Sequence, residues 1–153
     1  MRTDSRLSRM LHVLLHMARH DQQFTSEQIA KMLGTNAAVV RRTMGGLREK
    51  GYVATTKGRS GGWTIVCDLK KTTLFDINQA IGGTGLFSLG FDNPSPKCAV
   101  ERVVNKAINS AVEDAQKLLD DRLKKVTLAM LTADFDTICR VEGWVDRHSN
   151  SDG

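Results

Sequence analysis

The 153-residue sequence contains little that would cross-link, anchor or export a protein. No hydrophobic run approaches the roughly 20 residues that a membrane-spanning helix needs, and the polar start of the chain is not followed by the apolar stretch of a secretory signal. The three cysteines, Cys67, Cys98 and Cys139, are odd in number and widely spaced, which argues against a disulfide framework and against a Cys-x-x-Cys zinc module. We therefore expect a cytoplasmic protein with no membrane association.

Catalytic and cofactor-binding motifs are also missing. There is no Ser/His/Asp arrangement in a motif context, no pair of carboxylates in a recognisable loop and no cofactor fingerprint. The glycines at residues 83–85 follow no predicted strand and precede no Gly-Lys-Ser/Thr, so they do not indicate a nucleotide-binding loop. We predict that the protein is not an enzyme.

Charge is distributed unevenly along the chain. The net charge is +5, but residues 1–71 carry +8 and residues 72–153 carry −3. A basic segment of this kind favours a polyanionic partner such as nucleic acid. Uneven surface charge without any partner is the alternative that the charge pattern alone leaves open.

The first half of the chain has the element order of a winged helix–turn–helix. Apolar residues at three- and four-residue spacing predict a helix over residues 7–18. A capping hydroxyl in Thr25-Ser26 opens a short second helix that Gly34 closes, and Asn36 caps a third helix over residues 37–50. β-rich segments at residues 52–56 and 63–67 flank a glycine-rich turn at residues 57–62, which predicts a hairpin.

Two glycines interrupt the pattern of the third helix. Gly45 and Gly46 lie in its middle, where each glycine costs about 1 kcal/mol relative to alanine. We interpret the pair as room for close packing against another helix.

The second half of the chain predicts a long helix, and the rest of so small a domain cannot cover the whole apolar stripe of that helix. After a helix at residues 73–81 and an irregular segment that holds both prolines, residues 99–126 carry a continuous helical stripe about 40 Å long. We expect a second copy to cover this stripe, and folding back onto the same domain is the alternative. The predicted pairing residues are Val100, Val104, Ala107, Ala111 and Leu118.

The predicted fold class is mainly α with a small β-hairpin. We divide the chain into a winged helix–turn–helix domain at residues 1–81 and a loop at residues 82–98, which is a candidate sensor region because loops of this length are usually functional or mobile. A dimerisation helix and a short packing helix follow at residues 99–135. The C-terminal segment is residues 136–153, and we expect its polar tail to be disordered.

The third helix is the predicted DNA-reading element. In a helix–turn–helix, the N-terminal residues of the second helix lead into the major groove, and the start of the preceding helix suits phosphate contacts. Cations at the hairpin tip reach the neighbouring backbone or the minor groove. The candidate DNA-binding residues are Thr25, Ser26, Gln28, Asn36, Ala37, Ala38, Val40, Arg41, Arg42, Thr43, Lys57, Arg59 and Ser60. Solvated surface charge is the alternative for any single arginine.

Several short motifs resemble those of one family. They are Ser26-Glu27-Gln28-Ile29-Ala30, Val39-Val40-Arg41-Arg42, Gly51-Tyr52-Val53 and Gly58-Arg59-Ser60-Gly61-Gly62-Trp63. In this order they resemble the Rrf2 family of bacterial winged-helix transcriptional regulators, the group of IscR, NsrR and CymR, over about residues 1–133. The resemblance implies a homodimer with a long dimerisation helix, palindromic DNA and usually repression.

The cysteine pattern departs from that of the iron–sulfur members. Those members carry three closely spaced cysteines in the loop before the long helix, whereas this chain has only Cys98 there. A standard three-cysteine cluster site is therefore missing, and the setting resembles a branch with a single loop cysteine.

Cys98 is a candidate redox sensor. It falls at the predicted N-terminus of the long helix beside Lys97, where the helix dipole and the cation both favour the thiolate. A buried, inert thiol is the alternative. His12, His16 and His20 recur every four residues on the first helix, a spacing that more often means solvated side chains than a metal site.

We predict a sequence-specific, homodimeric transcriptional repressor that binds a palindromic operator on double-stranded DNA. The favoured signal is oxidation of the Cys98 thiol, with no cofactor and no metal. The alternatives are a regulator that senses a small ligand or a metal, one with an iron–sulfur cluster involving Cys98 and His12, or a winged helix used for protein–protein contact.

Overall fold

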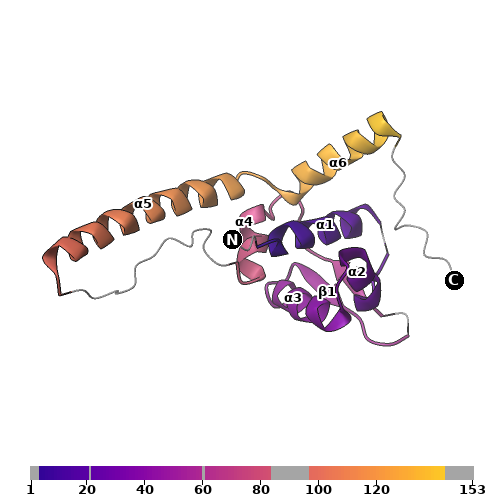
Figure 1. Ribbon diagram of the computed structural model, residues 1–153. Helices are drawn as coiled ribbons and strands as arrows, with labels where there is room; N and C mark the ends of the chain where they lie inside the picture. The colour runs from indigo at the N-terminus through magenta and orange to yellow at the C-terminus, as the bar shows by residue number, and fades with distance from the viewer. Residues whose placement is uncertain (1–3, 21, 60, 84–96, 144–153) are drawn as a thin grey trace.

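The computed structural model describes residues 4–20, 22–59, 61–83 and 97–143. Within these ranges the chain forms six helices and one two-stranded antiparallel sheet, which confirms the predicted fold class. The elements are α1 (Arg6–Arg19), α2 (Ser26–Leu33), α3 (Ala37–Glu49), β1 (Val53–Thr55), β2 (Trp63–Ile65), α4 (Leu74–Ala80), α5 (Ala99–Leu123) and α6 (Leu128–Glu142). In Figure 1, α2, α3 and β1 lie below α1, α6 lies above it, and α5 extends away to the left.

Helix α1 is the centre of the core. Its buried face contacts α2, β2, α4 and α6, and α3 packs in turn against α2, β1 and α4. Burying an aliphatic or methionine side chain of this size contributes about 1.5–3 kcal/mol. The buried apolar side chains include Met10, Val13, Leu14 and Met17 of α1, and Ile29, Val40, Met44, Leu47, Val53, Ile77 and Leu128 of the surrounding elements.

Local capping defines both helices of the helix–turn–helix. The Thr25 hydroxyl accepts the N–H of Gln28, and the Gln28 side chain accepts the N–H of Thr25 in return. Gly34 then ends α2 in the left-handed region, at φ +60°. The Asn36 side-chain oxygen accepts the Val39 N–H at 3.0 Å and opens α3. These contacts confirm the predicted caps, and of the pair Thr25-Ser26 it is Thr25 that caps α2.

The packing interpretation of the two α3 glycines is right for Gly46 and wrong for Gly45. A Cβ atom on Gly46 would collide with the Ala80 carbonyl oxygen, so α3 and α4 touch backbone to backbone at this point. A Cβ atom on Gly45 would meet nothing within 4 Å.

The hairpin is shorter than predicted and is joined to the start of α2. Each strand has three residues, with Val53 opposite Ile65 and Thr55 opposite Trp63. Phe24 and Trp63 exchange two backbone hydrogen bonds, with N···O distances of 3.1 and 2.8 Å. This bridge fixes the hairpin against the segment that leads into α2. Ser60, at the tip, lies outside the described residues.

Helix α5 projects away from the winged domain instead of folding back over it (Figure 1). Only Asn105 of its residues is buried, whereas Val100 and Leu118 are 72% and 67% exposed. At its C-terminal end the chain returns to the domain, where the Leu74 N–H donates to the Val126 carbonyl at 3.0 Å. The Lys124 ammonium also lies 4.5 Å from the centre of the Phe75 ring.

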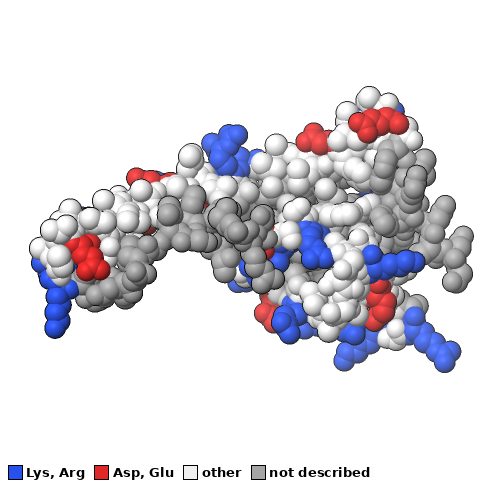
Figure 2. Space-filling view, viewed as in Figure 1, with Lys and Arg blue, Asp and Glu red and all other residues white. Residues whose placement is uncertain are grey.

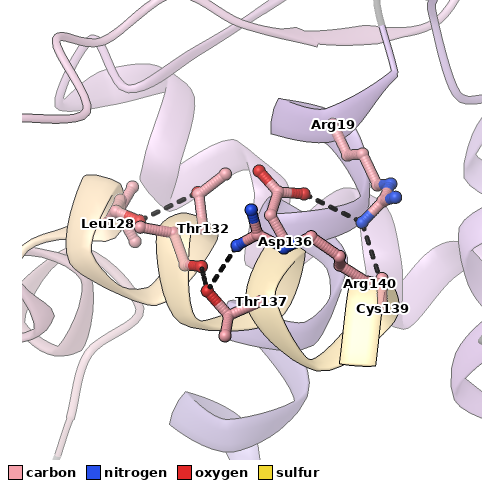
Figure 3. A network of polar contacts seen from close by, with 8 residues as sticks. Arg19, Leu128, Thr132, Asp136, Thr137, Cys139 and Arg140 are labelled. Carbon is pink, nitrogen blue, oxygen red and sulfur yellow. Dashed lines mark hydrogen bonds and ion pairs between the residues drawn. The ribbon is translucent and has the colours of Figure 1, made fainter. Parts of the chain in front are cut away.

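Helix α6 is longer than the predicted packing helix, because it continues past residue 135 to Glu142. Arg19 of α1 holds it: one guanidinium nitrogen is 2.9 Å from an Asp136 oxygen and 3.1 Å from the Cys139 sulfur, as Figure 3 shows. The same guanidinium lies 4.9 Å from the centre of the Phe135 ring. These contacts give the C-terminal half of α6 a fixed place on α1. The predicted disordered tail lies outside the described residues.

None of the helices in the described ranges has both the length and the apolar character needed to cross a membrane.

Candidate nucleic-acid interface

The start of α2, the outer face of α3 and the hairpin line a cleft of about 600 Å³. Arg41 and Arg48 extend from α3, and Lys57 and Arg59 come from the hairpin turn. All four of these residues are exposed. In Figure 2, lysine and arginine side chains gather along the edge of the molecule that α2, α3 and the hairpin form. The arrangement suits a ligand with repeated negative charge.

The exposed face of α3 contains some of the predicted DNA-binding residues but not all of them. Ala38, Arg41 and Arg42 are exposed. Val40 is 1% exposed and packs in the core, so the prediction that its side chain contacts DNA is wrong. Thr43 is half-buried, and its hydroxyl donates to the Val39 carbonyl of the same helix. Ala37 is also half-buried, at the first turn.

Three residues predicted to contact phosphate have structural partners in the free protein. Thr25 and Gln28 cap α2 through each other. The Ser26 hydroxyl accepts a hydrogen bond from the Trp63 indole N–H at 3.0 Å, which ties α2 to the hairpin. Of these contacts, the Ser26–Trp63 hydrogen bond joins two elements, and it fixes the hairpin relative to the start of α2.

Glycines shape the hairpin turn. A Cβ atom on Gly61 would collide with the Thr56 carbonyl oxygen, and one on Gly62 would lie 2.8 Å from the Phe24 carbonyl oxygen. Gly58 has a φ of +110°, which favours glycine. The Gly-Gly-Trp end of the motif is thus a steric requirement of closing the hairpin onto the segment before α2.

The cleft residues that the sequence analysis did not select include Glu27, Gly45 and Arg48. Glu27 pairs with Arg41 across the cleft, with 3.4 Å between the carboxylate oxygen and the guanidinium nitrogen. Gly45 and Arg48 follow Arg41 by four and seven residues, which places all three on one face of α3. This spacing from Arg41 could have identified Gly45 and Arg48 from the sequence alone. The position of Glu27 depends on how α2 and α3 pack.

Cys98 is the N-cap residue of α5 and is exposed, so within the single chain it is not the buried thiol of the alternative interpretation. The backbone N–H groups of Glu101 and Val100 in the first turn of α5 lower the pKa of the Cys98 thiol, although its sulfur makes no capping hydrogen bond. The predicted contribution of Lys97 is not among the causes of this shift. Cys67, in contrast, is partly buried, and burial raises the pKa of its thiol.

The histidines of α1 border a second, mostly apolar groove between α1 and α6, with a volume of about 540 Å³. The His12 and His16 rings lie 4.8 Å apart, and His16 is buried, contrary to the expectation of three solvated rings. Within the described residues no group of three or more His, Cys, Asp or Glu side chains is arranged to hold a metal ion. The groove is lined by Leu7, Ser8, Leu11, His12, Leu15, His16 and Phe135.

Comparison with known proteins gives one consistent family. Residues 3–134 match the family model Rrf2, described as an iron-dependent transcriptional regulator. The chain is 28% identical over 125 residues to YwnA of Bacillus subtilis strain 168, which is named as an HTH-type transcriptional regulator; the match covers 82% of this chain and 92% of YwnA.

Solved structures share the fold. A crystal structure named as a transcriptional regulator from Lactobacillus plantarum superposes with a TM-score of 0.72 at 19% identity, covering 91% of this chain and 95% of that one. The structure of CymR (YrzC), the global cysteine regulator of B. subtilis, superposes with a TM-score of 0.59 at 16% identity, covering 87% and 97%.

Proposed function

The chain belongs to the Rrf2 family of transcriptional regulators, and from that premise we propose that it is a homodimeric, cytoplasmic repressor that binds a palindromic operator and is switched by oxidation of Cys98. The observation that carries the DNA-binding part is the cleft, in which α3 and the hairpin present Arg41, Arg48, Lys57 and Arg59 together. In this proposal α3 enters the major groove with Ala38 and Arg42 toward the base edges, and the hairpin tip reaches the adjacent backbone.

The exposed apolar face of α5 supports dimerisation. The single chain leaves the apolar side chains of Val100, Val104 and Leu118 exposed. Ala107 and Ala111 between them are small and also exposed, which allows another helix to approach closely. A second copy whose α5 lies along this face would also offer its apolar residues to the groove between α1 and α6. Two winged domains held in this way would reach operator half-sites about 34–36 Å apart, or a multiple of that distance.

The exposure of Cys98 and its lowered pKa support the redox switch. Peroxide would react with the thiolate sulfur: an S–O bond forms, the O–O bond breaks, and hydroxide leaves, so that cysteine becomes sulfenic acid. The sulfenic acid would stand directly at the first turn of α5, where added bulk changes how that turn packs against a partner.

The three-cysteine iron–sulfur site of some family members does not fit this chain, because Cys98 is the sole cysteine between Cys67 and Cys139. We derive no step through such a cluster. A small ligand or a metal at the loop is the competing signal, and a response of DNA binding to either without oxidation would favour it.

Fluorescence anisotropy with a duplex from upstream of its own gene tests the proposal. We expect binding that weakens steeply with salt, with a log–log slope of about −0.9 for each phosphate contact. Arg42→Ala should lower the affinity for this duplex by about 1–3 kcal/mol if the side chain is bidentate to a base. Absence of a salt slope would instead favour a protein–protein role.

The switch is tested on the same duplex by comparing wild type, Cys98→Ser and the matched control Cys67→Ser before and after mild peroxide. We expect wild type and Cys67→Ser to lose binding and to regain it with excess thiol, whereas Cys98→Ser keeps it. An equal loss in Cys98→Ser would contradict the switch and leave the DNA-binding proposal standing.

A further inference from the structure

Two adjacent glycines in α3 have different reasons to be there. Gly46 is required by the fold, because any side chain at this position would collide with the Ala80 backbone of α4. Gly45 has no such reason: a Cβ atom there meets nothing within 4 Å, and no left-handed φ is present at this residue. Glycine nevertheless weakens the middle of a helix relative to alanine. Since the free protein does not need glycine at position 45, we look for the reason in what binds there.

Gly45 lines the cationic cleft. Arg41 precedes it by one turn and Arg48 follows it by nearly one turn, so two guanidinium groups flank a stretch of helix that has no side chain. The hairpin forms the opposite wall, with Lys57 and Arg59 among its lining residues. A gap bordered by cations is shaped for a compact anion that approaches the helix backbone closely.

One anionic group of the protein already lies in this cleft. The Glu27 carboxylate is 3.4 Å from the Arg41 guanidinium, and both side chains are largely exposed, at 70% and 55%. Exposed pairs of this kind contribute little stability and are readily exchanged for another partner. Glu27 therefore acts as the counter-ion of Arg41 in the free protein, and an incoming anion competes with it.

We infer that the surface of α3 over Gly45, between Arg41 and Arg48, is the seat of one phosphodiester group of the DNA backbone. The inference rests on the proposed DNA-binding function and assigns a ligand class to one part of the cleft. The missing side chain lets the backbone of one DNA strand approach α3, while residues nearer the helix start, Ala38 and Arg42, stay free to face the bases.

The test compares Gly45→Ala and Gly45→Leu with wild type on two duplexes, one from upstream of its own gene and one of unrelated sequence and equal length. We expect Gly45→Ala to raise Tm by about 2–4 °C, because alanine favours the helix and meets no neighbour. We expect Gly45→Leu to weaken binding to both duplexes by about tenfold or more. Gly46→Ala is the matched control, and its Tm should fall because of the Ala80 contact.

The charged neighbours give a second measurement that does not depend on side-chain volume. Arg48→Ala should make the log–log salt slope shallower by about 0.9 for each bound subunit on both duplexes, as loss of one phosphate contact requires. Lys125→Ala removes a cation from the turn between α5 and α6, on the far side of the domain from the hairpin (Figure 1), and should leave the slope unchanged.

Unchanged affinity of Gly45→Leu for both duplexes would overturn the inference and leave the DNA-binding proposal intact. A loss confined to the upstream duplex would also overturn it, because it would indicate a base contact at this position. Wild-type protein that binds neither duplex would instead overturn the proposed function together with this inference.

Discussion

The winged domain buries its large apolar side chains, whereas helix α5 exposes them. In α1 to α4 and the hairpin, side chains such as Val13, Met44 and Ile77 are fully buried. In α5, the side chains of Val100, Val103 and Leu118 face solvent over a helix of 25 residues. The described contacts of the chain bury the apolar side chains of the winged domain but leave those of α5 exposed. In the proposed function, DNA binding and pairing of copies therefore fall to regions with different sources of stability.

A charged substitution on the exposed apolar face of α5 should have the largest effect on DNA affinity. Val104→Glu places a charge in the proposed pairing face and should convert the dimer to a folded monomer, seen by analytical ultracentrifugation. Affinity for a palindromic operator should then fall by about 100-fold or more, because the two winged domains no longer bind as one unit. Asn109→Glu, at an exposed polar position on the same helix, is the matched control. A Val104→Glu dimer with normal affinity would refute the pairing role of α5.

The two regions should also differ in how their stability depends on protein concentration. Met44→Ala should lower the free energy of unfolding by about 2–5 kcal/mol at every concentration, because it leaves a cavity in the core. Leu118→Ala should change the urea midpoint in a concentration-dependent way, because it weakens association and not the fold of one chain. Parallel denaturation curves at two widely separated concentrations measure both. A concentration-independent effect of Leu118→Ala would show that α5 is stabilised within its own chain.

A smaller difference is expected between the thiols of the two regions. Alkylation by iodoacetamide can be followed residue by residue with mass spectrometry. As the pH is raised, the rate at Cys98 should increase at a lower pH than the rate for a free cysteine amide. The reason is that backbone N–H groups stabilise the Cys98 thiolate and lower its pKa. Cys67 should respond only at higher pH, because burial raises the pKa of its thiol. The reverse order would contradict a reactive thiol at the start of α5.

Sequence reasoning succeeded where structure is decided locally. The caps at Thr25 and Asn36, the end of α2 at Gly34 and the exposed stripe of α5 each depend on residues within a few positions of one another. It failed where the answer depends on packing between distant segments. The error at Val40 is of another kind: its spacing with Met44 and Leu47, which turns all three side chains to the core, can be read from the sequence, although Val40 also lies near the start of α3.

The cleft shows the same limit of local reasoning. Glu27 approaches Arg41 because α2 and α3 pack together, and no motif in either segment specifies that pair. Likewise, the contact of Arg19 with Cys139 joins residues 120 positions apart. Gly45 and Gly46 look equivalent in the sequence and differ only through the presence of α4 beside one of them.

The backbone bridge between Thr73 and Thr127 holds the residue before α4 beside the residue before α6. The Leu128 N–H donates to the Thr72 carbonyl at 2.9 Å, so the two ends are held edge to edge. Closing a flexible loop costs only about 0.6 kcal/mol more for each doubling of its length. A change in chain length between these two ends would therefore cost little free energy and need not displace the starts of α4 and α6.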